Sequence, residues 1–280
     1  MEIWHSACQS NEFLPTGWVG RYLDGQSNGF AHPYSAISFG NNLNPSLKGK
    51  SISGLAVTDP RNLHQMIQDP FMQSVGKHMD HHGEHHHDQV AYLHQTLNEA
   101  RSSVEYVYEK SKIQGTMLPY PTTKLGRQLK NIGQLIRAGS ATQVYYAEMS
   151  GFDTHAGQLA SQKRLFMEYS NALKVLIQDL KQSGEWKNTL IMTFSEFGRR
   201  VEQNAARGTD HGKANVLFLA GGNLENPGIS NTFAGLENLD KGDLQWQVDF
   251  RSVYGSIIQH HFHSSTQGII GAEVGIQKWV

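Results

Sequence analysis

Two stretches of the chain carry closely spaced acids and histidines that could bind a metal ion. Asp153 and His155 follow a β-prone run, and Asp210 and His211 lie together on a loop with a glycine on either side. Glu196 follows a second, apolar run. Carboxylate oxygens and imidazole nitrogens are ligands of zinc, manganese and similar divalent ions. These five residues are therefore a candidate centre for one ion, or for two ions about 3.5–4 Å apart.

Each of these residues also has an ordinary structural interpretation. Asp153 could cap a helix that begins near Gln158. Glu196 could be a solvated carboxylate or the ion-pair partner of Arg199, and His211 could be a simple loop histidine. Ligands of open α/β sheets bind beyond the carboxyl ends of the strands, so the joint placement of these residues favours a site. Arg199 could bind an anionic substrate group or be an ordinary helix-start charge.

A covalent hydrolytic mechanism would also need an activated hydroxyl. Thr154 and Ser195 are the catalytic candidates nearest to the proposed ligands in sequence, and Thr209 is a third hydroxyl in the same region. Local turn or cap hydrogen bonds are the favoured interpretation of all three. The sequence therefore leaves the nucleophile unassigned.

The elements that must position these residues alternate between strand and helix. Residues 143–149, 189–194 and 215–220 form short runs of β-branched, aromatic and aliphatic residues, which predict strands. Apolar residues at helical spacing predict four helices, over 84–114, 123–137, 158–182 and 250–262, with Gly139 ending the second and Asp249 capping the last. We expect the three strands in one sheet, the first two parallel, because a helical crossover joins parallel neighbours.

Composition excludes several classes of protein. The chain has 280 residues, with 24 Lys plus Arg against 25 Asp plus Glu, which argues against a surface built for nucleic acid or an anionic membrane. A single cysteine, Cys8, allows no intrachain disulfide. No apolar run approaches the roughly 18 residues that a membrane span needs. No Gly-x-Gly-x-x-Gly follows a strand, which disfavours a hydride-transfer enzyme.

A histidine-rich segment precedes the first long predicted helix. Seven of the 15 histidines fall between His78 and His94. Pairs four residues apart on a helix could bind a transition metal, but Gly83 interrupts the helical pattern. A solvated surface segment is the favoured interpretation.

Several of these segments resemble a bacterial family catalogued as domain of unknown function 1501. The resemblance runs through nearly the whole chain, and its motifs occur in the family's order. They are Thr16-Gly-Trp-Val-Gly-Arg-Tyr-Leu-Asp24, Gly151-Phe-Asp-Thr-His155, Thr193-Phe-Ser-Glu-Phe-Gly-Arg199, Gly208-Thr-Asp-His-Gly212 and Asp249-Phe-Arg251.

The resemblance implies an alkaline phosphatase/sulfatase-like fold, a three-layer α/β/α sandwich around a mostly parallel sheet. It implies divalent metal ions such as zinc, manganese or calcium, bound by Asp153, His155, Glu196 and His211. Asp210 would be either a further ligand or a partner that fixes the tautomer of His211. The implied substrates are phosphate or sulfate esters of small molecules or polysaccharides. The family's twin-arginine export signals imply an extracytoplasmic location.

The chain departs from the family pattern at its beginning. It starts after the region where the superfamily has its first strand, one metal-binding Asp and the nucleophile, and Met1 to His5 show no signal peptide. We therefore expect a partial domain over residues 1–280 with little ester turnover by itself. Two hypotheses stay open: a metal-dependent hydrolase that truncation inactivates, and a non-catalytic metal-binding or secretion-linked protein that keeps the fold.

Overall fold

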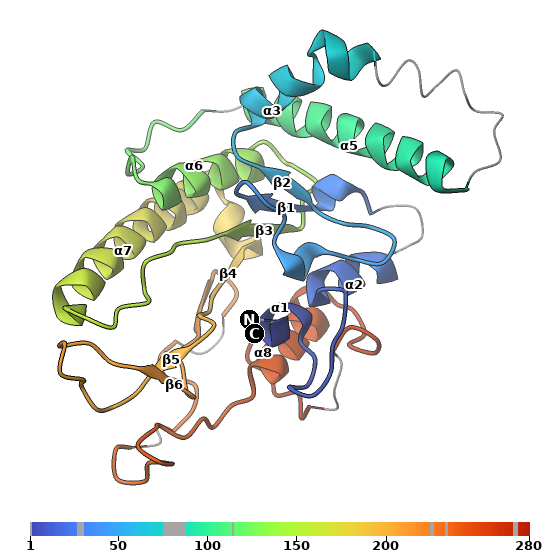
Figure 1. Ribbon diagram of the computed structural model, residues 1–280. Helices are drawn as coiled ribbons and strands as arrows, with labels where there is room; N and C mark the ends of the chain where they lie inside the picture. Colours follow the sequence, from blue (N-terminus) through green and yellow to red (C-terminus); the bar gives the residue numbers. More distant parts are fainter. Residues whose placement is uncertain are drawn as a thin grey trace. The chain divides into compact units, whose positions relative to one another are not determined.

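The computed structural model describes residues 2–26, 31–74, 88–113, 115–224, 227–232, 235–270 and 274–280. The histidine-rich segment 78–87, interpreted from the sequence as a solvated surface segment, lies outside the described residues. The chain is a mixed α/β protein with two compact units that interleave in sequence (Figure 1). Unit 1 comprises Met1–Pro15, Tyr120–Gly126 and Met149–Val280, and unit 2 comprises Thr16–Pro119 and Arg127–Glu148.

Unit 2 is built on a three-stranded parallel sheet. Its strands are β1 (Ala36–Phe39), β2 (Leu55–Val57) and β3 (Val144–Ala147), in the order β2-β1-β3. Ile37 lies opposite Leu55 on one side and Tyr145 on the other. All four residues of β1 are buried, as expected for the central strand of a parallel sheet.

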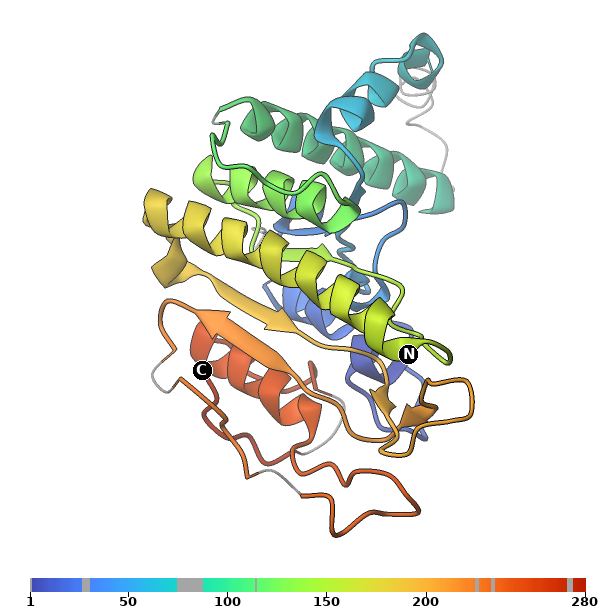
Figure 2. The same ribbon diagram turned by 90° about the vertical axis from the view of Figure 1, so that its left-hand side faces the viewer.

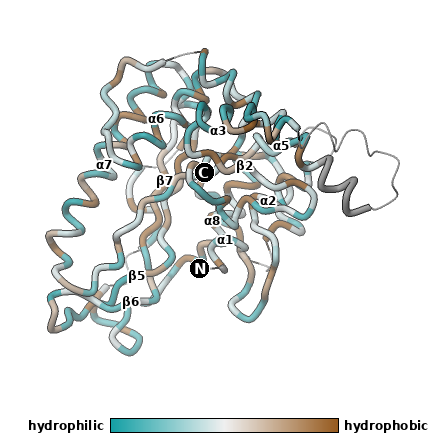
Figure 3. The backbone as a smooth tube through the Cα atoms, turned by 45° about the horizontal axis from the view of Figure 1, so that its top comes forward, coloured by the Kyte–Doolittle hydropathy of each residue, from teal (hydrophilic) through white to brown (hydrophobic). Residues whose placement is uncertain are grey.

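Helices accompany this sheet in unit 2. They are α2 (Trp18–Gly25), α3 (Pro60–Ile67), α5 (Asp88–Ile113) and most of α6 (Lys124–Arg137). The predicted helix over 123–137 is confirmed. Gly139 ends it with a φ of 62°, a left-handed conformation that favours glycine. The hydropathy of successive residues alternates along the backbone tube of α6 (Figure 3), and Leu129, Ile132 and Leu135 of this helix are buried.

The motif over residues 16–24 has a structural role in unit 2. A Cβ atom at Gly17 or Gly20 would collide with the backbone of residues 45–49, so α2 can approach that loop only through glycine. The carboxylate of Asp24 accepts hydrogen bonds from three successive backbone N–H groups, at 2.6–3.0 Å, from Lys50, Ser51 and Ile52. This motif therefore fixes a helix to a loop, and its residue types need no catalytic explanation.

Unit 1 contains two antiparallel strand pairs. β4 (Leu190–Thr193) pairs with β7 (Phe218–Gly221), and the short β5 (Gly198–Arg199) pairs with β6 (His211–Gly212). Figure 2 shows β4 and β7 side by side, between α7 (Gln158–Ser183) and α8 (Phe250–Ser256). The predicted helix over 158–182 is confirmed, and so is the Asp249 cap, whose carboxylate accepts from the N–H of Arg251 at 2.9 Å.

The prediction of a single sheet is wrong. The runs at 143–149 and 189–194 contain β3 and β4, and the run at 215–220 overlaps β7. However, β3 pairs with β1, and β4 pairs with β7 in a separate, antiparallel pair. The other two strands of the parallel sheet, β1 and β2, come from the glycine- and asparagine-rich region before residue 58 and are only four and three residues long. Strands this short carry little pattern, so the pairing of β1 with β2 and β3 could not be anticipated.

The two ends of the described chain pack together within unit 1. The ring of Trp4 in α1 (Glu2–Ser6) stacks on Phe250 with centroids 3.9 Å apart, and it also stacks on Phe194 at 5.8 Å. The hydroxyl of Tyr254, a fully buried residue of α8, donates to the carbonyl of Trp4 at 3.1 Å. These aromatic contacts form a core next to the end of β4.

No helix among the described residues combines the length and the apolar character required to cross a membrane.

Candidate metal centre

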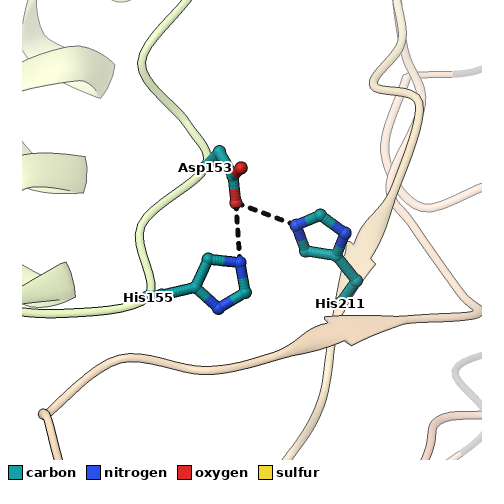
Figure 4. A group of neighbouring side chains, drawn as sticks. All are labelled: Asp153, His155 and His211. Atoms are coloured by element: carbon teal, nitrogen blue, oxygen red, sulfur yellow. Dashed lines mark hydrogen bonds and ion pairs between the residues drawn. The ribbon is translucent and has the colours of Figure 1, made fainter.

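Three of the predicted ligands lie together in unit 1. Asp153 and His155 come from the loop that precedes α7, and His211 comes from β6 (Figure 4). The Oδ1 atom of Asp153 lies 2.8 Å from Nε2 of His211 and 2.9 Å from Nε2 of His155. One ligand atom from each residue lies within 4.8 Å of the others. Residues 58 positions apart in sequence therefore share one potential coordination site.

The loop that carries Asp153 and His155 has a glycine in a left-handed conformation near each end and a buried threonine in its middle. Gly151 has a φ of 99° and Gly157 a φ of 54°, both left-handed conformations. Between them the side chain of Thr154 is buried, whereas those of Asp153 and His155 are 59% and 50% exposed. The buried threonine anchors the loop, and its two neighbours consequently face outward together.

Asn204, which sequence reasoning missed, holds this loop in place. Its Nδ2 donates to the carbonyl of His155 at 3.1 Å, and its Oδ1 accepts from the N–H groups of Ala206 and Gly208 at 3.0 Å. Glycine is required at 208 because a Cβ there would lie 2.7 Å from the backbone nitrogen of Ala156 and closer still to the carbonyl of His155. Gly208 thus allows its segment to pack closely against the backbone of the His155 loop.

Arg199 bridges the two segments that carry the ligands. Its Nη1 donates to the carbonyl of Thr209 at 2.6 Å, and its Nη2 donates to the carbonyl of Phe152. The same Nη2 lies 3.6 Å from Oδ1 of Asp153. Only 16% of the Arg199 side chain is exposed. The guanidinium therefore braces the site, and its predicted contact with a substrate anion stays a prediction.

Phe197 supports the third ligand and was not anticipated either. Its ring stacks on the imidazole of His211 with centroids 3.9 Å apart and planes 9° apart. The guanidinium carbon of Arg199 lies 5.0 Å from the centre of the same ring. The pairing of β5 with β6, in which Arg199 faces His211, brings these three side chains together.

The other two predicted ligands lie outside this group of three. The Oδ1 atom of Asp210 is 3.4 Å from Nδ1 of His155, so its carboxylate faces that histidine. The sequence had suggested the adjacent His211 as its partner. Glu196 is exposed, and its charge acts on His5: burial lowers the pKa of His5, and Glu196 acts in the opposite direction. A direct role of Glu196 as a ligand stays a prediction.

The candidate hydroxyls all donate hydrogen bonds within unit 1, and two of these bonds are local in sequence. Thr154 donates to the carbonyl of Phe152 at 3.4 Å, and Ser195 donates to the carbonyl of Phe197 at 3.0 Å. Thr209 donates to Oε1 of Gln158 at 2.8 Å. The bonds of Thr154 and Ser195 are the turn arrangements expected for hydroxyls without a catalytic role. The prediction of a local bond is wrong for Thr209, whose partner lies 51 residues away at the start of α7.

Comparison with known families identifies the chain. The model of a family described as a protein of unknown function (DUF1501) matches residues 61–234, well over half of the sequence. The chain belongs to the DUF1501 family. The matched region contains all five predicted metal ligands. No curated protein and no solved structure matches this DUF1501 chain.

The electrostatics of the DUF1501 site favour an ionised carboxylate. The hydrogen bond from His211 lowers the pKa of Asp153, against a smaller opposing effect of desolvation. The charges of His155, His211 and Arg199 lower the same pKa further. The carboxylate of Asp153 is therefore anionic at neutral pH, and it lies between two imidazole nitrogens.

The DUF1501 residues fit the ligand chemistry of a zinc-like ion. Zinc takes nitrogen and oxygen ligands at about 2.0–2.2 Å, so neighbouring tetrahedral ligand atoms lie about 3.3–3.5 Å apart. The Asp153–His155 and Asp153–His211 pairs are at 2.9 and 2.8 Å, so each needs to open by only about half an ångström. Three protein ligands with a position open to solvent are the usual donor set of a catalytic zinc site.

Proposed function

We propose that this DUF1501 protein is a metal-dependent hydrolase of phosphate or sulfate esters, with Asp153, His155 and His211 as the protein ligands of a divalent ion. The observation that supports this most is the convergence of the three ligand atoms within 4.8 Å. Zinc, manganese and calcium are the ions expected. When bound, such an ion would polarise an ester oxygen and lower the pKa of a bound water.

The residues around the ion have distinct tasks in this proposal. Asp153 supplies the negative charge that a dication requires, and its lowered pKa keeps that charge at neutral pH. Arg199 and Asn204 fix the backbone of the two ligand segments relative to each other. The ligand side chains are about half-exposed, so an ester group on a small molecule or a polysaccharide can reach them.

The proposal extends to an alkaline phosphatase/sulfatase-like fold and to an extracytoplasmic location. The parallel sheet of unit 2 and the placement of two ligands just after a strand support the first of these. The family's twin-arginine export signals suggest the second.

One observation favours a second candidate function, a metal-binding protein without hydrolytic activity. The hydroxyls of Thr154, Ser195 and Thr209 each donate a hydrogen bond to an acceptor other than Asp153, His155 or His211. A covalent mechanism would need one of them to be released, whereas metal binding would not.

Metal analysis and ester hydrolysis together test the proposal. Purified wild-type protein should bind one or two zinc ions, and Asp153→Asn and His211→Ala should lose zinc and any hydrolysis of aryl phosphates and aryl sulfates. His260→Ala, at an exposed histidine of the same unit, is the matched control and should keep both. Zinc binding without turnover would favour the non-catalytic function. Failure of the wild-type protein to bind zinc, manganese or calcium would reject the metal centre.

A further inference from the structure

His155 has a carboxylate facing each of its two ring nitrogens. Nε2 lies 2.9 Å from Oδ1 of Asp153, and Nδ1 lies 3.4 Å from Oδ1 of Asp210. The second distance is only a few tenths of an ångström beyond the usual N–H···O range. Asp210 is thus adjacent in sequence to one ligand, His211, and adjacent in space to the other.

This arrangement bears on which nitrogen of His155 carries a proton. A neutral imidazole has one N–H group, and a nitrogen that binds a metal ion must present its lone pair. A carboxylate at Nδ1 holds the proton there and leaves Nε2 free as a ligand, as in the carboxylate–histidine–metal groups of many metalloproteins. Asp153 cannot do this for Nε2, because its own oxygen is proposed to bind the same ion.

We propose that Asp210 is a positioning residue that holds the proton of His155 on Nδ1 and so directs Nε2 to the metal ion. The inference rests on the metal centre of the proposed function. It gives Asp210 a role different from that of a direct ligand and assigns its partner as His155.

The backbone of Asp210 is fixed well enough for this task. Its carbonyl accepts a hydrogen bond from the N–H of Arg200 at 3.0 Å, next to the β5–β6 pairing. Two residues earlier, Gly208 packs against the carbonyl of His155 itself. The carboxylate therefore meets the imidazole from a segment whose distance to the His155 loop is set by backbone packing. Because both side chains are about half-exposed, the pair acts through orientation more than through the strength of the ion pair.

Two variants separate this role from general stabilisation. Asp210→Ala removes the acceptor, and Asp210→Asn keeps an oxygen that can accept from Nδ1–H. Asp240→Asn is the control, at a half-exposed aspartate of the same unit that is paired with Lys213. Zinc affinity, measured by competition with a chelator, should fall about 10- to 100-fold in Asp210→Ala. It should be largely restored in Asp210→Asn and unchanged in Asp240→Asn.

The tautomer of His155 gives a second readout that a purely structural role would not move. Long-range ¹⁵N–¹H NMR at about pH 8.5, where an imidazole is ordinarily neutral, should show a smaller share of Nδ1–H at His155 in Asp210→Ala than in wild type. An unchanged tautomer share, or wild-type zinc affinity in Asp210→Ala, would overturn the proposal. If wild-type protein binds no zinc, the proposed function fails, and the tautomer of the metal-free protein alone decides the role of Asp210.

Discussion

Replacing Gly208 with alanine should weaken metal binding without altering any ligand side chain. The new Cβ would lie 2.7 Å from the nitrogen of Ala156, whereas ordinary van der Waals contacts lie at 3.4–4 Å. The loop that carries His155 must therefore retreat by at least about 0.7 Å. Metal–ligand distances tolerate about 0.2 Å, so the displacement is more than three times what the site can absorb.

The expected loss follows from that displacement. Misplacement of a reacting group by about 1 Å can cost about 100-fold in rate, and we expect a loss of zinc affinity between 10- and 100-fold. Forcing an extra carbon into packed backbone should also lower the free energy of unfolding by about 1–3 kcal/mol. The hydrogen bond from Asn204 to the carbonyl of His155 would be strained by the same movement.

Zinc competition titrations and urea unfolding measure the two effects. Gly275→Ala is the matched control in the same unit, because a Cβ there has open space within 4 Å and the φ angle is not left-handed. It should match wild type in both assays. Wild-type zinc affinity in Gly208→Ala would show that the close packing of this glycine on His155 does not set the site's geometry.

Three further predictions concern stability. Zinc at 100 times its dissociation constant should stabilise the wild-type protein by about 2.7 kcal/mol, and thermal unfolding of His211→Ala should show no such gain. Burial raises the pKa of Tyr145 to about 12, so the folded state favours the neutral phenol. That stability is fully present below pH 10 and is lost as the pH rises toward 12, by about 2–3 kcal/mol. Urea unfolding at about pH 9 and pH 11.5 should show a smaller fall in Tyr145→Phe, and an equal fall in both proteins would contradict the assignment. Asp24→Ala should lower the free energy of unfolding by about 2 kcal/mol, because three backbone N–H groups lose a charged acceptor. Denaturant titration should show a smaller loss for Asp24→Asn.

The helices α5, α6, α7 and α8 and the strands β3, β4 and β7 were predictable because their signals are local. The periodicity of apolar residues predicted both ends of α6 and of α7 to within one residue. Asp249, as a predicted N-terminal cap, marked the start of α8. Sheet pairing was not predictable, since β1 and β2 are too short to show a period and the partner of β3 is chosen by tertiary packing. An apolar run indicates burial but does not indicate the neighbour.

The site divides along the same line. Asp153, His155 and His211 could be predicted because carboxylate and imidazole side chains are potential metal ligands, which is evident from the residue types alone. Asn204 and Phe197 could not, because they act through a backbone carbonyl and a stacked ring. Asparagine four residues before a glycine is the one local signal, since Asn204 accepts from the N–H of Gly208.

The packing of α1 against α8 sets the order in which the chain can mature on the ribosome. Trp4 is made roughly 250 residues before Phe250, on which its ring stacks, and before Tyr254, which donates to its carbonyl. Unit 2 is complete once residue 148 has emerged, so it can fold while synthesis continues. After unit 2 is complete, roughly a hundred further residues must be made before Phe250 can cover the ring of Trp4. Contacts between residues so distant in sequence form slowly. Nascent chains should therefore expose this tryptophan to chaperones until α8 is released.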